Sequence, residues 1–169
     1  MKKVLLVLGS NRDFYNYKIL KEIEKEVDNA KLIKLSDYKL EYCRGCLACD
    51  KLAKCVIDDD LKKIVDLMVA SDIIVFAIPN YFGGMSGFFK NFMDRLHYMY
   101  KRSVLKFKEI VFIYTGALEN DSITMEEMTH STKNIEKYLE MNVIKRYSFS
   151  SRKELDMNKV NDIINLLNK

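Results

Sequence analysis

Five short apolar runs alternate along this chain with five segments of helical periodicity, and this alternation constrains the fold more than any other feature. The apolar runs are rich in β-branched residues and span 4–8, 31–35, 73–78, 110–114 and 143–149. The periodic segments span 17–27, 61–69, 88–99, 125–139 and 158–167. Strands that alternate with helices build parallel β-α-β units. The chain therefore predicts an α/β fold, with one parallel sheet and helices on both of its faces.

Composition narrows the class of protein. At 169 residues, with 49% hydrophobic and 31% charged residues, the chain suits one soluble domain. Its net charge of +4 comes from charges mixed along the whole length, which argues against a nucleic-acid partner. The apolar runs are too short to cross a bilayer, and the first suits a buried strand better than a signal peptide. We expect a cytoplasmic protein with no membrane partner, in which thiols stay reduced.

The few glycines gather after the predicted strands. Gly9 follows the first strand and Gly116 the fourth, while Gly83, Gly84 and Gly87 follow the third. The carboxyl ends of parallel strands form the ligand edge of such sheets, where backbone must turn tightly or approach a ligand. These positions indicate that edge, although turns also need glycine without any ligand.

The loop after the first strand, residues 9–18, carries hydroxyl, guanidinium and amide groups at the start of a helix. Such groups, with the free N–H groups of a helix start, suit a phosphate. The loop lacks the further glycines of a dinucleotide fingerprint and the Gly-Lys-Ser/Thr of a Walker loop. The alternative is a helix capped by Asn16, with Ser10 and Arg12 merely solvated.

The loop after the third strand begins at Pro79 and pairs two aromatic residues, Tyr81 and Phe82, with adjacent glycines. This pattern offers close backbone N–H groups and a flat wall to a ring system. Ser86 is the predicted cap of the next helix. Alternatively, the two aromatic residues belong to the core at a strand end.

All four cysteines of the chain lie between residues 43 and 55, as Cys43, Cys46, Cys49 and Cys55. Thiolates at such intervals can converge on an iron–sulfur cluster, although the last gap and the missing proline differ from the bacterial ferredoxin run. Free or redox-active thiols are the alternative. Structural zinc usually draws two well-separated ligand pairs, so zinc is less favoured.

Three other polar features receive structural interpretations. The carboxylates of residues 58–60 precede a predicted helix, where they are expected to cap it and favour its dipole rather than bind a metal. His97 and His130 lie in helical segments with no carboxylate or cysteine at ligand spacing, so neither is assigned a role.

Taken together, three motifs resemble the NADPH-dependent FMN reductase superfamily and, within it, are most similar to the iron–sulfur flavoproteins. The motifs are Gly9-Ser-x-Arg with Asn16, Cys43-x2-Cys46-x2-Cys49-x5-Cys55 followed by acidic residues, and Pro79-x-Tyr81-x-Gly83 with Lys90, Asp94 and Arg95 on the next helix. The resemblance implies a flavodoxin-like three-layer sandwich, with a five-stranded parallel sheet of order 2-1-3-4-5. It also implies a homodimer or homotetramer with FMN near a subunit interface.

The resemblance also implies the site residues. Those expected around FMN are Ser10, Arg12, Asn16 and Tyr17 at the phosphate, Pro79, Asn80, Tyr81, Phe82, Gly83 and Gly84 along the isoalloxazine, and Thr115, Gly116 and Ala117 on its other side. The family commonly has Thr where this chain has Tyr17. The cysteines at 43, 46, 49 and 55 match the positions that bind a [4Fe-4S] cluster. No catalytic acid or base is implied, because the flavin supplies the chemistry.

These features lead to one expected architecture and two rival functions. Residues 1–169 are expected to form a single FMN-binding domain with a cysteine-rich insert at 36–58. The leading function is an NAD(P)H-dependent reductase of flavin, quinone or another small acceptor. The alternative is an electron carrier that relays electrons between ferredoxin-like protein partners. A third possibility is a scaffold that has lost its flavin.

Overall fold

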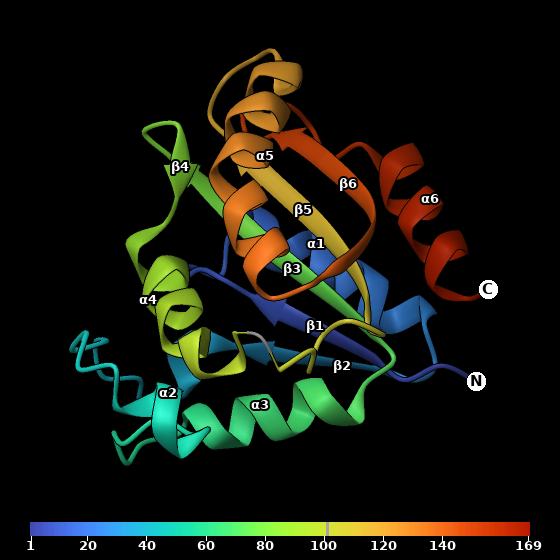
Figure 1. Ribbon diagram of the computed structural model, residues 1–169. Helices are drawn as coiled ribbons and strands as arrows, with labels where there is room; N and C mark the ends of the chain where they lie inside the picture. The colour runs from blue at the N-terminus through green and yellow to red at the C-terminus, as the bar shows by residue number, and fades with distance from the viewer. Residues whose placement is uncertain (101) are drawn as a thin grey trace.

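A sheet of parallel strands lies between two layers of helices in the computed structural model, which describes residues 1–100 and 102–169 (Figure 1). The elements, with η1 and η2 as short 3₁₀ helices, are β1 (Val4–Leu8), α1 (Tyr15–Glu26), β2 (Ala30–Lys34), η1 (Leu35–Asp37), α2 (Ala48–Leu52), α3 (Leu61–Ala70), β3 (Ile73–Tyr81), β4 (Gly84–Met85), α4 (Gly87–Arg95), η2 (Leu96–Met99), β5 (Glu109–Gly116), α5 (Asp121–Tyr138), β6 (Asn142–Ser150) and α6 (Met157–Leu167). None of the described helices is long and apolar enough to span a membrane.

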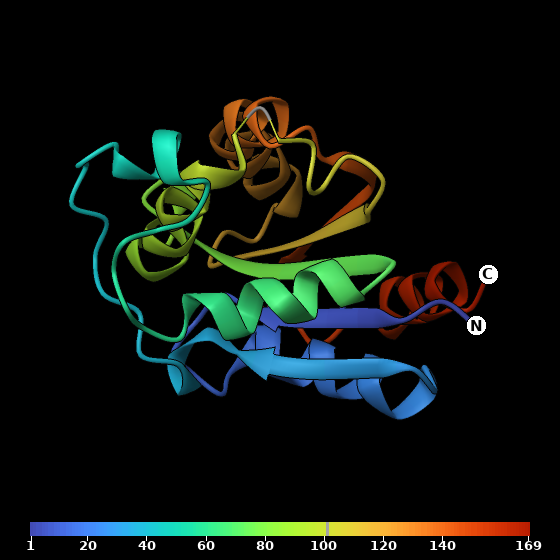
Figure 2. The ribbon, with the colours of Figure 1, turned by 60° about the horizontal axis from the view of Figure 1, so that its bottom comes forward.

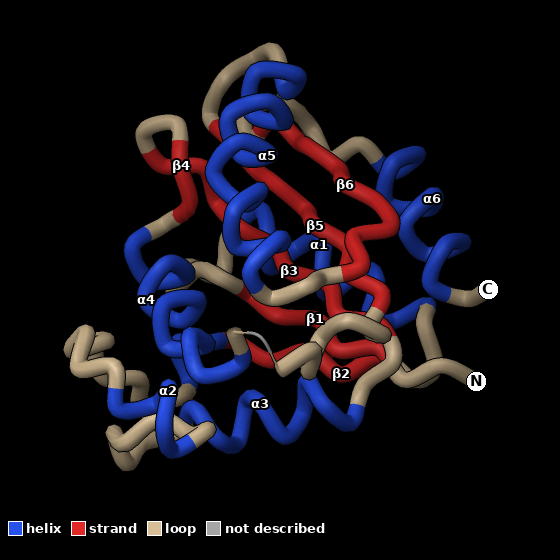
Figure 3. The backbone as a smooth tube through the Cα atoms, viewed as in Figure 1, coloured by secondary structure: helices blue, strands red, loops and turns tan. Residues whose placement is uncertain are grey.

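The strand order confirms the predicted flavodoxin-like topology. The long strands pair in the order β2-β1-β3-β5-β6, and every neighbouring pair among them is parallel. Counted along the chain, this is the predicted order 2-1-3-4-5. Their carboxyl ends therefore share one edge of the sheet, with the strand order reversing between β1 and β3. All five predicted helices are present (Figure 3).

The sheet has one strand more than the sequence predicts. The short strand β4 pairs antiparallel with the end of β3, with Tyr81 opposite Gly84, so the segment expected as a loop is a tight hairpin. Its two turn residues, Phe82 and Gly83, both have positive φ, at 53° and 76°. Turns of this hand match the twist of the flanking strands. The sixth strand is thus a local consequence of the turn and leaves the parallel sheet unchanged.

Both faces of the sheet are buried, which explains why its strands appear in the sequence as continuous runs of apolar residues. Along β1, Leu5 and Val7 pack into a core beneath α3, α4 and α5, whereas Leu6 and Leu8 pack into a second core beneath α1 and α6. Figure 2 shows the helices on opposite sides of the sheet. The cysteine-bearing segment lies outside these layers, at the carboxyl edge beside α4 (Figures 1 and 2).

Phe82 adopts an unfavourable backbone conformation while its side chain is fully exposed. A left-handed conformation costs a non-glycine residue about 1–2 kcal/mol, and Asn followed by Gly is the preferred pair for this turn. We expect Phe82→Asn to raise the free energy of unfolding by about 1 kcal/mol, measured by urea denaturation. Phe107, also exposed but without a positive φ, provides the matched control Phe107→Asn, which should give no comparable gain. An equal gain in both variants would attribute the effect to lost surface hydrophobicity.

Candidate functional site

Loops from four strands enclose a hollow of about 200 Å³ at the carboxyl edge of the sheet. Its lining residues are Ser10, Arg12, Phe14, Tyr15, Asn16, Pro79, Asn80, Tyr81, Thr115, Gly116, Ala117 and Ser151. Nine of the thirteen residues predicted at the flavin are in this set, so the fold brings together three loops that are far apart in sequence.

The hollow lies at the start of α1, and this helix start has no side-chain cap. Phe14 occupies the capping position and makes no side-chain hydrogen bond to the helix, and the first turn carries no acidic residue. Asn16 lies inside the helix rather than at its cap, so the interpretation of Asn16 as the cap is wrong. The first backbone N–H groups of a helix have no intrahelical acceptors and attract anions. This end of α1 is therefore suited to a phosphate.

Asn16 and Ser10 add polar groups to the same hollow. Asn16 is buried, and its Oδ1 has no hydrogen-bond donor among the described residues. A buried amide of this kind requires a partner, which a ligand hydroxyl can supply, or a ligand phosphate if the amide is turned. The Ser10 hydroxyl accepts a hydrogen bond from the backbone N–H of Arg12 at 3.0 Å, which fixes the turn of the loop.

Four predicted flavin residues are not among the lining residues of the hollow. The ring of Tyr17 instead contacts Lys34, whose Nζ lies 4.4 Å from the ring centroid. The same Nζ donates a hydrogen bond to Asp13 at 2.6 Å. The others, Phe82, Gly83 and Gly84, form the tip of the β3–β4 hairpin beyond the hollow. Tyr81 lines the hollow and is about half exposed, so of the two aromatic residues of this loop only Tyr81 lies at the hollow.

A second hollow, of about 320 Å³, contains all four cysteines. Cys43, Cys46, Cys49 and Cys55 line it together with Asp94, Arg95 and His97 from α4 and η2. Cys43 and Cys46 are exposed, whereas Cys49 and Cys55 are partly buried. No three of these sulfur atoms lie within 4.8 Å of one another, so this conformation does not form a single-ion site of cysteines alone. A four-iron cluster lies between its ligands and separates them more widely than one ion does.

Helix α4 holds the backbone that leads into this second hollow. Asn91 accepts from the backbone N–H of Cys43 at 3.2 Å and donates to the Glu41 carbonyl at 3.3 Å. One turn later, Arg95 donates to the same Glu41 carbonyl at 2.5 Å and to both carboxylate oxygens of Asp59 at 2.7 and 3.0 Å. Residues four apart share one helix face. Asn91 and Arg95 therefore fix both ends of the cysteine segment to α4.

The Arg95–Asp59 pair is fully buried, since both side chains have 0% exposure. Burial alone raises the pKa of Asp59, but hydrogen bonds from Arg95 and from the backbone N–H groups of Glu41 and Leu61 outweigh it, and the pKa is lowered. Asp59 thus accepts from the first N–H group of α3, whereas Asp60, at the capping position, makes no side-chain hydrogen bond to the backbone of the helix, so the predicted capping is met by Asp59 alone. The Arg95 Nε is buried without an acceptor among the described residues.

The cysteine segment also contains the short helix α2, which the sequence pattern does not predict. Within α2, burial raises the pKa of the Cys49 thiol, and the neighbouring Asp50 carboxylate raises it further. Asp50 Oδ1 lies 3.1 Å from Nε2 of His97 and accepts a hydrogen bond from it when that nitrogen is protonated. His97, to which the sequence assigned no role, therefore has a carboxylate partner after all. This partner comes from a distant segment and not from its own helix.

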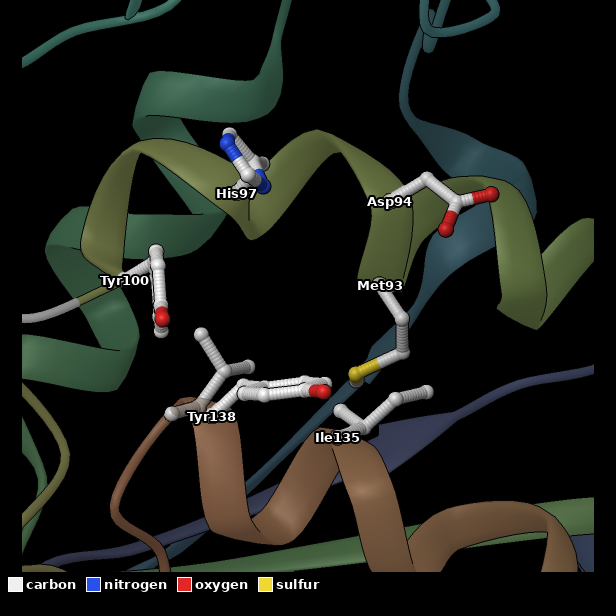
Figure 4. A pocket seen from close by; sticks show the side chains of 7 residues that line it. Met93, Asp94, His97, Tyr100, Ile135 and Tyr138 are labelled. Atoms are coloured by element: carbon white, nitrogen blue, oxygen red, sulfur yellow. The ribbon is translucent and has the colours of Figure 1, made fainter. Parts of the chain in front are cut away.

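A third hollow, of about 340 Å³, lies between the α4–η2 segment and α5 (Figure 4). Met93, Asp94, His97 and Tyr100 line it from one side, and Ile135, Tyr138 and Leu139 from the other. The rings of Tyr100 and Tyr138 meet edge to face, with centroids 5.6 Å apart. Asp94 and His97 also line the cysteine hollow, so these two spaces share a wall.

The sequence assigns no role to Asn91. It presents Arg95 only as part of the motif on the helix that follows Pro79-x-Tyr81-x-Gly83. An available signal was the spacing of Asn91 and Arg95, four residues apart and next to the apolar Phe92 and Leu96, which indicates polar groups near a buried helix face. Ser86, in contrast, is confirmed as the cap of α4. Its hydroxyl accepts from the Phe89 N–H at 3.2 Å and donates to the Gly9 carbonyl at 2.9 Å. This bond ties α4 to the loop of the first hollow.

The parallel sheet, its strand order and the loops at its carboxyl edge place the chain in the flavodoxin-like fold class. The chain belongs to the NADPH-dependent FMN reductase family, whose model matches residues 2–156. It is 38% identical over 97 residues to an iron-sulfur flavoprotein of Archaeoglobus fulgidus, a match that covers 55% of this chain and 48% of that protein. An iron-sulfur flavoprotein of Clostridioides difficile is 37% identical over 87 residues, covering 50% of this chain and 39% of the other.

A solved structure supports the fold. A putative quinone reductase from Klebsiella pneumoniae superposes with a TM-score of 0.76 at 14% identity, covering 99% of this chain and 83% of that one. At this identity the likeness concerns the fold alone. The chain spans half or less of the length of the two curated relatives described above.

Proposed function

We propose that this chain is an FMN-binding oxidoreductase that holds the flavin at the hollow beside α1. The observation that carries the proposal is the uncapped start of α1 next to the buried, unpartnered Oδ1 of Asn16. A phosphate anion satisfies the free N–H groups of α1, and the ribityl hydroxyls offer donors to Asn16. Membership of the FMN reductase family supports the same ligand.

The residues of the chain bind and orient the flavin in this proposal. Arg12 neutralises phosphate charge at the mouth of the hollow, and Ser10 maintains the turn that aims the loop. Pro79, Asn80 and Tyr81 border one side of the ring system, while Thr115, Gly116 and Ala117 border the other. FMN, when bound, supplies hydride and single-electron transfer. We propose residues 1–169 as one FMN-binding domain with a cysteine-rich insert at 36–58.

We further propose that Cys43, Cys46, Cys49 and Cys55 hold a [4Fe-4S] cluster, as the names of the curated relatives suggest. The four thiols line one hollow, and the buried Nε of Arg95 has no acceptor of its own there. Cluster sulfurs accept hydrogen bonds, and a buried guanidinium favours the negative charge of a thiolate-bound cluster. The residues present therefore fit a cluster.

The reaction that we propose is the oxidation of NAD(P)H with reduction of flavin, a quinone or another small acceptor. The second candidate is an electron carrier between protein partners, which the exposure of Cys43 and Cys46 favours because a partner can approach these sulfurs. Steady-state assays distinguish the two. Turnover of NAD(P)H with flavin or quinone acceptors supports the reductase, and no turnover with any acceptor supports the carrier. Assembly as a homodimer or homotetramer is part of the proposal.

The flavin proposal is tested by anaerobic purification, absorption spectroscopy and counts of iron and acid-labile sulfide. Bound flavin with iron and sulfide in equal amounts is the expected result. Apo-protein titrated with FMN should quench flavin fluorescence at a one-to-one ratio. If excess FMN is neither bound nor quenched, the flavin proposal is rejected.

Replacement of Cys46 by Ser is expected to abolish the iron content and leave FMN binding unchanged. The reason is that a cluster with a missing thiolate is lost, whereas Cys46 does not line the flavin hollow. Ser103→Ala serves as a control outside both hollows. Unchanged iron in the Cys46 variant would contradict the ligand assignment while leaving the flavin proposal intact.

A further inference from the structure

A hydrogen bond joins the first hollow, beside α1, to helix α5. Asn80, near the end of β3, lines this hollow. Its Nδ2 donates to Oε2 of Glu127, on α5, at 2.6 Å. In the part of the chain that the structure describes, Asn80 Oδ1 is buried and has no hydrogen-bond donor. The pair therefore leaves one polar atom at the hollow without a partner.

The carboxylate of Glu127 determines which way the Asn80 amide faces. An amide carries a carbonyl oxygen, which accepts hydrogen bonds, and an NH₂ group, which donates them. The two exchange places when the amide turns over, so an isolated asparagine can present either one to a ligand. An ionised carboxylate only accepts. Glu127 therefore retains the NH₂ group, and the atom of Asn80 that is left for a ligand is an acceptor.

Anchoring of the β3–β4 hairpin accounts for part of this arrangement. Ser131, one turn after Glu127 on α5, accepts from the backbone N–H of Met85 at 3.4 Å. Met85 lies opposite Asn80 in the hairpin, so α5 contacts both of its strands. An anchor at Asn80 needs only the NH₂ group, however, and does not explain the buried carbonyl oxygen, whose lack of a partner is destabilising. A ligand that donates to this oxygen removes that cost.

We propose that Asn80 Oδ1 accepts a hydrogen bond from an N–H group of the flavin ring, and that Glu127 is the positioning residue that keeps the amide in this direction. The inference rests on the proposed function, since it requires FMN in the first hollow. The flavin ring carries such a donor at nitrogen N3 in the oxidised state, and at nitrogen N5 as well after reduction. Hydrogen bonds to the ring nitrogens tune the electronics of the cofactor.

Two single substitutions separate this contact from anchoring of the hairpin. Asn80→Leu should weaken FMN binding at least about tenfold, because a buried ring donor is left without an acceptor. Glu127→Leu should weaken it by no more than about threefold, since the freed amide still presents its oxygen part of the time. Affinity is measured by quenching of flavin fluorescence. Glu126→Leu, at the exposed neighbouring position of α5, is the matched control and should leave affinity unchanged.

Far-ultraviolet circular dichroism of each variant verifies that it folds. Equal losses of affinity in Asn80→Leu and Glu127→Leu would overturn the proposal, because anchoring alone then accounts for both. An unchanged affinity in Asn80→Leu would overturn it as well.

A double variant tests the direction of the amide. Asn80→Asp with Glu127→Gln keeps the net charge of the pair and reverses its hydrogen bond, since the introduced glutamine donates to the introduced carboxylate. The second carboxylate oxygen remains available to the ring. FMN affinity should therefore lie within about threefold of the parent. A folded double variant that binds as weakly as Asn80→Leu would overturn the proposal, because the ligand would then need the NH₂ group.

The ring contact itself is observed by nuclear magnetic resonance of bound FMN labelled with nitrogen-15, in oxidised and in reduced form. One ring N–H proton should move upfield in Asn80→Leu, either at N3 in both forms or at N5 in the reduced form alone. In the second case the midpoint potential of the flavin should also fall. If neither proton shifts in a variant that still binds FMN, this inference is rejected and the proposed function stands. A parent chain that binds no FMN would reject the proposed function itself.

Discussion

Replacement of Arg95 by Met is expected to lower the free energy of unfolding by about 3–5 kcal/mol. The substitution leaves the Asp59 carboxylate buried without its counter-ion, because both side chains have no solvent exposure in the folded chain. The measurement is urea-induced unfolding of protein free of flavin and metal, followed by circular dichroism. The exposed pair of Lys90 and Asp94 on the same helix supplies the control Lys90→Met, expected within about 0.5 kcal/mol of the parent.

The double variant Asp59→Asn with Arg95→Met separates charge burial from packing. Removal of both charges should restore part of the lost stability, because the unpaired buried carboxylate is then absent. A double variant no more stable than Arg95→Met would show that packing and the Glu41 contact, rather than the unpaired charge, account for the loss. Iron content should fall in both variants, since the Arg95 contacts that bind one end of the cysteine segment to α4 are lost while those of Asn91 remain.

The same pair predicts a pH dependence. The pKa of Asp59 is lower in the folded chain than its ordinary value of 3.8. Its contribution to stability is therefore complete above that value and is lost as the pH falls through the folded pKa. In Arg95→Met the pairing is gone, so the difference in stability between parent and variant should narrow below about pH 4. A difference that stays constant down to pH 2 would contradict this account.

Replacement of Asn16 by Asp is expected to weaken FMN binding at least about 100-fold. The new carboxylate lies in the first turn of α1, where the proposed phosphate carries its own negative charge, and like charges placed together cost several kcal/mol. Affinity is measured by quenching of flavin fluorescence. Asn161→Asp, at an exposed position of α6, adds the same charge far from the hollow and should leave affinity unchanged.

The stability of the apo-protein distinguishes a binding defect from a folding defect in the Asn16 variant. An acidic residue in the first turn of a helix is favourable for its dipole, which offsets the cost of burying the charge. An affinity within threefold of the parent, in a folded variant, would mean that the phosphate does not bind at this end of α1.

The sequence was sufficient to predict the parallel sheet and its strand order, because strands buried on both faces carry an unmistakable apolar pattern. It also located most of the lining of the first hollow, since glycine and proline mark the ends of β1, β3 and β5. It did not reveal β4, because Phe is an unusual residue in a turn of positive φ.

Contacts between distant segments account for what the sequence could not show at the second hollow. Arg95 resembles any surface arginine until Asp59, on another segment, is placed beside it. His97 likewise has no ligand partner within its own helix, and its neighbours Cys49 and Asp50 become adjacent only after α2 packs on η2. Spacing along one helix predicts contacts within that helix, and tertiary packing determines the others.

The dependence of the cysteine segment on α4 has a consequence for the order of events during biosynthesis. Asn91 follows Cys43 by 48 positions and Arg95 follows Asp59 by 36, so the cysteines leave the ribosome well before the helix that fixes them. Synthesis proceeds from the N-terminus, and a domain folds as a unit. During this interval the nascent thiols have no fixed geometry. Delivery of a metal to these thiols would therefore be productive only after α4 has been translated and has docked on the sheet.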